Sequence, residues 1–299
     1  MFYSCYGLII QSDLALPELI GLETEPDTPS DVTITLDEVS AAGLCDGKQL
    51  GPYLWVSDTA LWLEVPHVAR FLVVDGQRIV IQPASGIDED SVRVFLLGSG
   101  MGALLFQRGL LVLHGNAIRI GDQCMICVGH SGAGKSTLAA GFLKRGYDIL
   151  ADDVAPIDSN VRALPGFPRI KLWQDTANRL GVDTAGLRRI RPELEKFNYP
   201  LNNRFTDRPL PVRWIYLLGT HRDPDIHFET ISGFERFSPL LENTYRVQFL
   251  QSLPLKATHM KNCCDLAGRI HLSRVTRPDY GFSLDALIDG ILVDIEANP

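Results

Sequence analysis

The first third of the chain alternates between apolar and polar residues in short runs that are typical of β-strands. Two of these runs flank Asp75-Gly76-Gln77-Arg78, which predicts a hairpin connection. The clearest runs are 32–36, 61–65, 71–74 and 79–81. Residues 91–107 are mostly apolar over a longer stretch, which predicts a buried helix. We therefore expect a β-rich N-terminal domain over residues 1–88.

Beyond residue 88 strand-like and helix-like segments alternate, which predicts an α/β domain over residues 89–299. An apolar strand is predicted over residues 110–120, with an interruption at His114-Gly115. A second apolar strand, 123–128, leads through a glycine-rich loop into a helix over residues 136–145. Shorter helices are predicted further along, at 172–181 and 184–189.

The glycine-rich loop matches G-x-x-x-x-G-K-[ST], the P-loop, which wraps nucleotide phosphates in its own backbone amides. Glycines admit an anion where a Cβ would collide, and successive N–H groups form a nest around it. A strand before the loop and a helix after it place the positive end of the helix dipole at the phosphates. Lys135 adds a charge for the β/γ-phosphates, and the Ser136 hydroxyl can ligate Mg²⁺. The predicted nucleotide-binding residues are Gly129, Ser131, Gly132, Ala133, Gly134, Lys135, Ser136 and Thr137.

A pair of carboxylates, Asp152-Asp153, follows the short apolar run 147–151. Phosphoryl transfer needs one carboxylate that holds Mg²⁺ and another that accepts the proton of the attacking hydroxyl. Neighbouring side chains at a strand end point to opposite sides, so the two aspartates can take different roles. His114 is a further candidate, although a histidine beside an apolar strand is more often a hydrogen-bonded core residue.

These three segments together resemble the HPr kinase/phosphorylase family. The P-loop of that family, G-x-S-G-x-G-K-S, is matched by residues 129–136, and its upstream His-Gly is matched by His114-Gly115. Its Lys-Arg-Gly, strand and Ala-Asp-Asp are matched by residues 144–146 and 151–153. The resemblance is specific over about residues 108–156.

The resemblance implies a role for each matched residue. It makes Asp152 the catalytic base that activates the acceptor hydroxyl, with His114 as its partner in the active site. It places Asp153 and Ser136 on the metal side, and Lys135 with the loop amides around the phosphates. It also implies a core like that of phosphoenolpyruvate carboxykinase, with a mixed rather than a strictly parallel sheet.

Two further segments bear on the acceptor. Residues 164–175 contain no glutamate and lack the Arg-Gly-rich signature that the bifunctional enzymes use to remove phosphate from HPr. Phosphorylase activity, a glutamate metal ligand and HPr as acceptor are therefore not carried over. Residues 6–19 resemble the opening of stand-alone HPr-kinase-like proteins found beside peptide-modification genes, including kinases that phosphorylate a serine of lasso-peptide precursors.

Composition and cysteine usage limit the partners and the compartment. A net charge of −8 argues against nucleic acid as the main partner. Cys124 and Cys127 lie three residues apart on a predicted strand and point to opposite faces, so we interpret them as small buried hydrophobic residues. The longest apolar stretch, 94–106, is shorter than the ~20 residues that span a bilayer. With no targeting segment visible, we predict a cytoplasmic protein without a membrane partner.

The sequence therefore predicts an ATP- and Mg²⁺-dependent kinase that phosphorylates a serine hydroxyl of a peptide or small protein. A P-loop is indifferent to the acceptor, so a kinase of a sugar, amino acid or nucleoside stays open, as does an ATPase or nucleotide-operated binding module. Arg204 and Arg208, in the proline-punctuated stretch 198–211, are candidates for neutralising charge on the transferred group. A homo-oligomer is compatible with the sequence.

Overall fold

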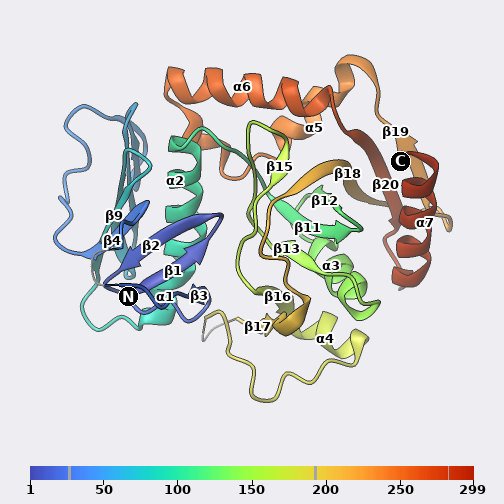
Figure 1. The fold of residues 1–299 in the computed structure, drawn as a ribbon, viewed down its shortest axis with the longest axis horizontal. Coiled ribbons are helices and arrows are strands. Elements are labelled where there is room, and N and C mark those ends of the chain that lie inside the picture. Colours follow the sequence, from blue (N-terminus) through green and yellow to red (C-terminus); the bar gives the residue numbers. More distant parts are fainter. Residues whose placement is uncertain (26–27, 192–193, 282) are drawn as a thin grey trace.

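The computed structural model describes residues 1–25, 28–191, 194–281 and 283–299. The fold is mixed α/β, with two large sheets and a helical layer between them (Figure 1). This agrees with the α/β class that the sequence predicts and with the mixed sheet that the family resemblance implies.

The first sheet lies entirely within residues 2–83 and has the strand order β3-β1-β2-β4-β9-β8-β7-β6-β5. Most neighbours are antiparallel, but β4 is parallel to both β2 and β9. Along β8 every second side chain is buried, so one face of this strand packs against a core, as the sequence pattern predicts. The bounds are β1 (Phe2–Cys5), β2 (Leu8–Ser12), β3 (Ile20–Gly21), β4 (Val32–Leu36), β5 (Lys48–Gly51), β6 (Leu54–Val56), β7 (Ala60–Val65), β8 (Ala69–Val74) and β9 (Arg78–Pro83).

The helical layer between the sheets consists of α1 (Glu89–Phe95) and α2 (Met101–Gln107), joined by a π-helical turn at Leu96–Gly100. This confirms the predicted buried helix. Gly102 permits a close approach, because a Cβ there would lie 2.7 Å from the Tyr245 ring. Side chains of this layer and of the first sheet share one hydrophobic cluster, which includes Phe71 and Phe106. Residues on both sides of position 88 thus pack together, and a division into separately folding units 1–88 and 89–299 stays a prediction.

The second sheet carries the P-loop strand near its centre. Its order is β10-β14-β15-β18-β12-β11-β13, with β20 beside β18 and β19 beside β20. Strands β12, β18 and β20 are parallel, and the other pairs are antiparallel. The bounds are β10 (Leu111–Leu113), β11 (Gly115–Ile120), β12 (Gln123–Gly129), β13 (Ile149–Ala151), β14 (Ala155–Ile157), β15 (Arg162–Ala163), β18 (Leu210–His221), β19 (His227–Thr230) and β20 (His271–Pro278). A separate antiparallel ribbon is formed by β16 (Arg169–Trp173) and β17 (Lys196–Pro200).

Helices cover the second sheet on both faces. Helices α3 (Lys135–Lys144), α4 (Gln174–Leu180) and α7 (Leu284–Ala297) contribute to the hydrophobic cluster on one face, and α5 (Phe237–Glu242) and α6 (Leu253–Ala267) to the cluster on the other. In Figure 1, α6 runs along the top of the molecule and α7 closes its right-hand side. Cys127 belongs to the first of these clusters and Cys124 to the second, and both thiols are free and buried. The predicted opposite orientation of the two cysteines is confirmed. Short 3₁₀ turns complete the described elements at Asn202–Arg204, Gly233–Arg236 and Val247–Leu250.

Two of the predicted local structures are wrong. Residues 184–189 form no helix, because Gly186 has φ +88°, a left-handed conformation in which a helix cannot continue. Residues Leu172 and Trp173 pair with β17 and so belong to β16, and α4 begins only at Gln174.

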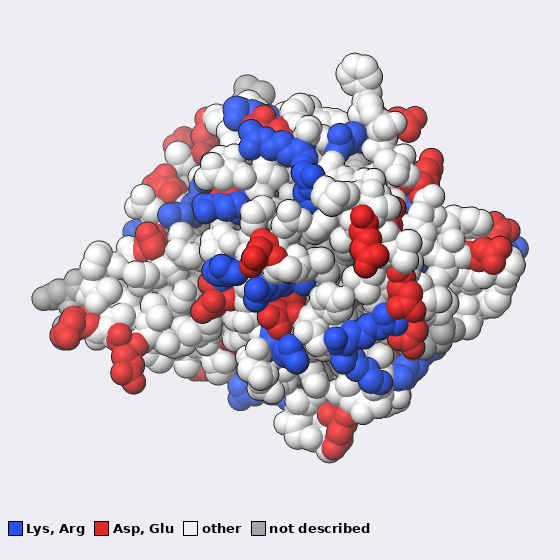
Figure 2. Space-filling view, turned by 45° about the vertical axis from the view of Figure 1, so that its right-hand side comes forward, with Lys and Arg blue, Asp and Glu red and all other residues white. Residues whose placement is uncertain are grey.

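On the face drawn in Figure 2, basic and acidic side chains are interspersed, and neither sign covers the surface alone. Among the helices in the described ranges, none has the length and apolar composition needed to cross a bilayer.

Candidate functional site

A cavity of about 760 Å³ lies over the P-loop. It collects side chains from β11, the P-loop, the end of β13, helix α4 and the start of β17. The predicted site residues that line it are His114, Ser131, Gly132, Gly134, Lys135, Ser136, Thr137, Asp152 and Asp153. Gly129 and Ala133 were also predicted but are not among its lining residues. One cavity thus contains the phosphate loop and both aspartates.

The backbone of the P-loop depends on glycine at three positions. Gly129 ends β12 with φ +147°, and a Cβ there would lie 2.6 Å from the Leu218 carbonyl oxygen on the neighbouring strand. Gly134 has φ +99° immediately before the first residue of α3, which opens the N-terminus of that helix toward the cavity. Gly132 has φ +86° and no atom within 4 Å of an added Cβ, so the loop is open at this point. The loop therefore has the geometry that close approach of an anion requires.

Lys135 is folded back onto its own loop. Its Nζ donates to the Gly129 carbonyl at 2.7 Å and to the His130 carbonyl at 3.2 Å. Its side chain is buried, and this desolvation lowers the pKa of its ammonium, while Asp153 and Asp152 act in the opposite direction. An ammonium has three hydrogens, so one stays available for a phosphate.

Asp152 lies at the end of β13 and is 8% exposed. One of its carboxylate oxygens accepts a hydrogen bond from the Asn116 side chain, and the other accepts one from the Lys171 backbone N–H at 2.6 Å. Burial raises the pKa of Asp152, and the neighbouring Asp153 carboxylate raises it further. A carboxylate whose pKa is raised toward neutrality is a better proton acceptor than an ordinary surface aspartate.

Asp153 has a different environment. Burial on its own raises the pKa of Asp153, but the Lys171 ammonium, 2.6 Å from Oδ2, outweighs this and holds that pKa below its usual range. The Nδ1 atom of His114 lies 3.3 Å from Oδ1 and 2.9 Å from the Asp153 backbone oxygen. Asp153 also has φ +74°, which is uncommon for a residue other than glycine and marks strain that the surrounding contacts must hold. The two adjacent carboxylates therefore have pKa values shifted in opposite directions.

His114 lines the same cavity as Asp152, but its hydrogen bond goes to Asp153. The contacts that the structure gives for its ring go to Asp153 and to the tilted ring of Tyr245, with ring centroids 5.9 Å apart. Asn116, two residues further along, is the side chain that contacts Asp152. The reason is the interruption at His114, which separates β10 from β11 and turns the histidine toward the backbone of Asp153. Burial lowers the pKa of His114, so the ring favours its neutral form.

The positive charge at the aspartate pair comes from residues that the sequence analysis did not single out. Lys171 on β16 and Lys196 on β17 both act on Asp152 and Asp153. In the ribbon Lys171 lies opposite Asn198, and Lys196 is two residues from Asn198 on the same strand, so the two lysines share a face. The Lys196 ammonium also lies 5.2 Å from the centre of the Trp173 ring. Arg169-Ile170-Lys171-Leu172 alternates basic and apolar residues, a period-two signal that could have identified this face.

The two loop arginines proposed from the sequence lie elsewhere. Arg204 donates to the Gly146 carbonyl and lies 3.6 Å from Asp148, and Arg208 contacts Asp122. Neither arginine lines the cavity. Their expected role in neutralising the transferred group is not supported by this geometry.

The N-terminal sheet contacts the segment behind the aspartates. The β1–β2 turn places the Tyr6 N–H on the Pro165 carbonyl at 2.8 Å, and the Tyr6 ring packs against Phe167. The Gly166 N–H in turn donates to the Leu150 carbonyl, two residues before Asp152. The end of β13 is thus supported from the N-terminal region through two layers of main-chain hydrogen bonds.

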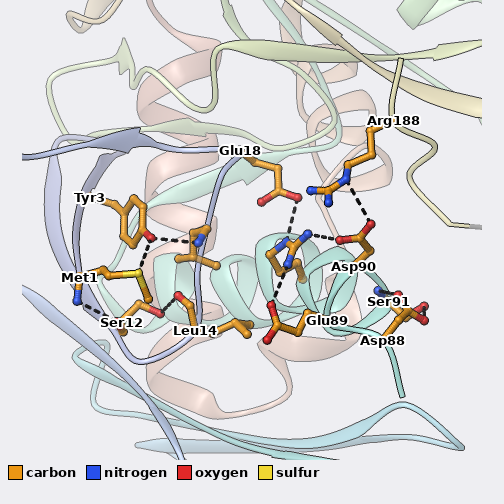
Figure 3. Close-up of polar contacts among 12 residues, drawn as sticks. Met1, Tyr3, Ser12, Leu14, Glu18, Asp88, Glu89, Asp90, Ser91 and Arg188 are labelled. Carbon is orange, nitrogen blue, oxygen red and sulfur yellow. Dashed lines mark hydrogen bonds and ion pairs between the residues drawn. The ribbon is translucent and has the colours of Figure 1, made fainter. Parts of the chain in front are cut away.

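A second connection runs through Arg93 of α1, which is 4% exposed and pairs with Glu18 at 3.1 Å and with Asp90 (Figure 3). Asp90 also contacts Arg188 at 3.4 Å, in the chain that leads toward β17. This network joins the N-terminal segment, the helical layer and the approach to the Lys196 strand. Within this network the Arg93–Glu18 pair is buried, and a buried, paired charge favours one relative arrangement of the elements that it joins.

The residues around the cavity fit a magnesium ion by the chemistry of their donors. Mg²⁺ prefers oxygen ligands and is usually held by one or two carboxylates together with substrate phosphates. The Ser136 hydroxyl and the Asp153 carboxylate supply such oxygens at the cavity wall. Asp153 is held ionised by Lys171, which is the protonation state that a metal ligand needs.

Comparisons with known proteins add little to this geometry. No family model matches the chain, and no curated protein matches it. The solved structures that match include the HPr(Ser) kinase/phosphatase from Coxiella burnetii. The chain is similar to it over 62% of its own length and 98% of that chain, at 12% sequence identity and a TM-score of 0.27.

Proposed function

We propose that this chain is an ATP- and Mg²⁺-dependent kinase that transfers the γ-phosphoryl group to a serine hydroxyl of a peptide or small protein. The observation that carries the proposal is the single cavity containing the P-loop, an aspartate with a raised pKa and an ionised aspartate. We further propose that the core has the architecture of phosphoenolpyruvate carboxykinase, because parallel and antiparallel strands mix around the P-loop strand.

The residues divide the reaction between them. The loop amides and Lys135 bind the β/γ-phosphates, and Lys135 exchanges its contacts with the Gly129 and His130 carbonyls for phosphate oxygens. Asp152 accepts the proton of the attacking hydroxyl, and its hydrogen bonds from Asn116 and Lys171 hold the carboxylate in one orientation. Ser136 and Asp153 would hold Mg²⁺, which would supply positive charge to neutralise the transferred group.

A serine of a peptide is the acceptor that we propose, since residues 6–19 resemble the opening of kinases that modify lasso-peptide precursors. In the fold these residues include the β1–β2 turn that packs behind the aspartates, and Glu18, which pairs with Arg93. The acceptor is tested by offering labelled ATP with pools of peptides and of metabolites. Transfer to serine peptides is expected, and transfer only to metabolites would exclude a peptide acceptor.

The role of Asp152 is tested with the Asp152→Asn variant in single-turnover transfer. We expect nucleotide binding to be retained and transfer to fall about 10²–10⁴-fold, the usual contribution of a general base. Asp122→Asn is the matched control, because its side chain is 85% exposed and lies at a surface turn. Wild-type transfer by Asp152→Asn would remove this residue from its role, and rapid hydrolysis without any acceptor would favour an ATPase.

A further inference from the structure

A second group of metal-ligand side chains lies at the end of β18. His221 ends that strand, His227 begins β19, and Asp223 lies in the connection between them. Each residue offers one ligand atom, and the three atoms lie within 4.8 Å of one another. The two imidazole rings have centroids 4.8 Å apart, and Nε2 of His227 lies 3.8 Å from Oδ2 of Asp223.

The sheet register explains why these residues meet. Strand β20 lies between β18 and β19, with His221 opposite Pro278 and His227 opposite Thr276. Thr276 and Pro278 are two residues apart on one strand, so their side chains share a face. The two histidines therefore approach each other across β20 on that face, and the fold itself brings them together.

His221 is the residue whose environment points to a ligand. Both of its ring nitrogens are inaccessible to solvent, and neither has a hydrogen-bond partner among the described residues. A neutral imidazole keeps one lone pair that must be satisfied, and a buried polar atom without a partner is unfavourable. His227 and Asp223 are 54% and 72% exposed, so an ion can reach the group from solvent.

We propose that His221, Asp223 and His227 bind a transition-metal ion, with Zn²⁺ as the best match. Two imidazoles and one carboxylate suit Zn²⁺, whereas Mg²⁺ and Ca²⁺ prefer oxygen ligands alone. Three protein ligands leave a fourth tetrahedral position for water or another ligand. Zn–N bonds of about 2.0–2.1 Å hold ligands about 3.4 Å apart, so the side chains close in by about 1.4 Å on binding.

This site is distinct from the nucleotide cavity. Arg277 alternates with Thr276 and Pro278 along β20 and so points to the opposite face of the sheet. On that face the Arg277 guanidinium lies against Gly134 of the P-loop, because a Cβ added to this glycine would be 3.3 Å from it. The proposed metal ion therefore lies on the reverse side of the strand and is not the magnesium ion of the nucleotide. Its binding needs no nucleotide, and its effect is to join the end of β18 to the start of β19 through the connection that carries Asp223.

The test is a calorimetric titration of Zn²⁺ into the full-length protein after treatment with a chelator, without nucleotide. One equivalent is expected to bind, and His221→Gln or His227→Gln should weaken binding at least about tenfold, since even loss of an outer partner of a ligand costs 10–100-fold. His67→Asn is the matched control, because it removes an exposed imidazole away from the proposed site. The backbone of His67 has a φ of 64°, and asparagine tolerates this left-handed conformation. Circular dichroism establishes that each variant is folded.

A second measurement separates this site from exposed thiols. Co²⁺ bound by nitrogen and oxygen ligands gives visible d–d bands without the intense ultraviolet thiolate charge-transfer band, and we expect that spectrum from the wild-type protein. A thiolate band would assign the ion to Cys45 or Cys264, both of which are exposed. That result, the absence of binding, or equal binding by the wild type and the histidine variants would overturn the proposal.

Discussion

Lys171 is the residue whose replacement tests the electrostatics of the site most sharply. Its ammonium lies 2.6 Å from Asp153, and the two side chains are 15% and 26% exposed. In Lys171→Met the aliphatic stem is kept and the ammonium is lost, so the Asp153 carboxylate keeps its contact with His114 and the charge of Lys196. Removing one partner of a fully buried pair costs about 3–5 kcal/mol. Since Asp153 retains some contact with water, we expect about 2–3 kcal/mol at pH 7.

The pH dependence follows from the pKa of Asp153. In the wild type this pKa lies below the unfolded value, so the carboxylate stabilises the fold above about pH 4 and loses that contribution as the pH falls through the folded-state pKa. Without this ammonium we expect burial, which raises the pKa of Asp153, to outweigh the remaining effects of His114 and Lys196, so that this pKa rises above the unfolded value. The ionised carboxylate then destabilises the variant at neutral pH, and protonation relieves this cost as the pH falls. The deficit of Lys171→Met should therefore be larger at pH 7 than at pH 5.

Urea unfolding at pH 5 and pH 7 measures the loss of stability and its pH dependence. In thermal unfolding at pH 7, the melting temperature of the variant should be roughly 5–10 °C lower. Lys261→Met is the matched control, because Lys261 pairs with Asp265 at 2.9 Å but is 73% exposed. We expect it to leave the free energy of unfolding nearly unchanged, because an exposed ion pair is screened by water. If Lys171→Met costs no more than this control, or if its deficit is the same at pH 5 and pH 7, the charge pairing described for Asp153 is wrong.

Three further predictions concern the phosphate loop and the base. Lys135→Ala should reduce phosphoryl transfer about 10²–10³-fold in a quenched-flow assay, and unchanged transfer would exclude a role for its charge. Asn116→Ala removes a hydrogen bond to the Asp152 carboxylate, so it should raise the pKa of Asp152 and move the acidic limb of the kcat–pH profile to higher pH, whereas an unmoved limb would show that Asn116 does not act on Asp152. Gly129→Ala should destabilise the fold by about 2–4 kcal/mol, because its Cβ would lie 2.6 Å from a β18 carbonyl. Gly132→Ala, also at positive φ but in open space, should cost clearly less in the same thermal unfolding series, and equal costs would contradict the packing argument.

Much of the core region could be predicted because its signals are local. The strand, glycine loop and helix around residues 123–145 depend on apolar runs and on glycines, which a sequence displays directly. The break at His114 also followed from the sequence, and β10 and β11 are separated there. The cavity likewise brings the predicted aspartates to the predicted loop, because β11 pairs with both β12 and β13.

The residues that shift the pKa values of the aspartates were harder to predict, because they reach the site through tertiary pairing. The alternation over residues 169–172 indicates a basic strand face but not what that face contacts. Lys171 and Lys196 are 25 positions apart and meet only when β16 pairs with β17. Asn116 contacts Asp152 across 36 positions, and no local pattern marks that pair. The helix predicted at 184–189 failed for a local reason that periodicity overlooks, the left-handed glycine at position 186.

The central claim is that the twin aspartates and the P-loop act on one phosphate in one cavity. A crystal structure with Mg²⁺ and a non-hydrolysable ATP analogue tests it most directly. The account predicts that the terminal phosphate lies between the P-loop and Asp152, and that the Nζ atom of Lys135 has left the Gly129 and His130 carbonyls for a phosphate oxygen. An analogue bound outside this cavity, or a terminal phosphate that neither aspartate faces, would contradict it.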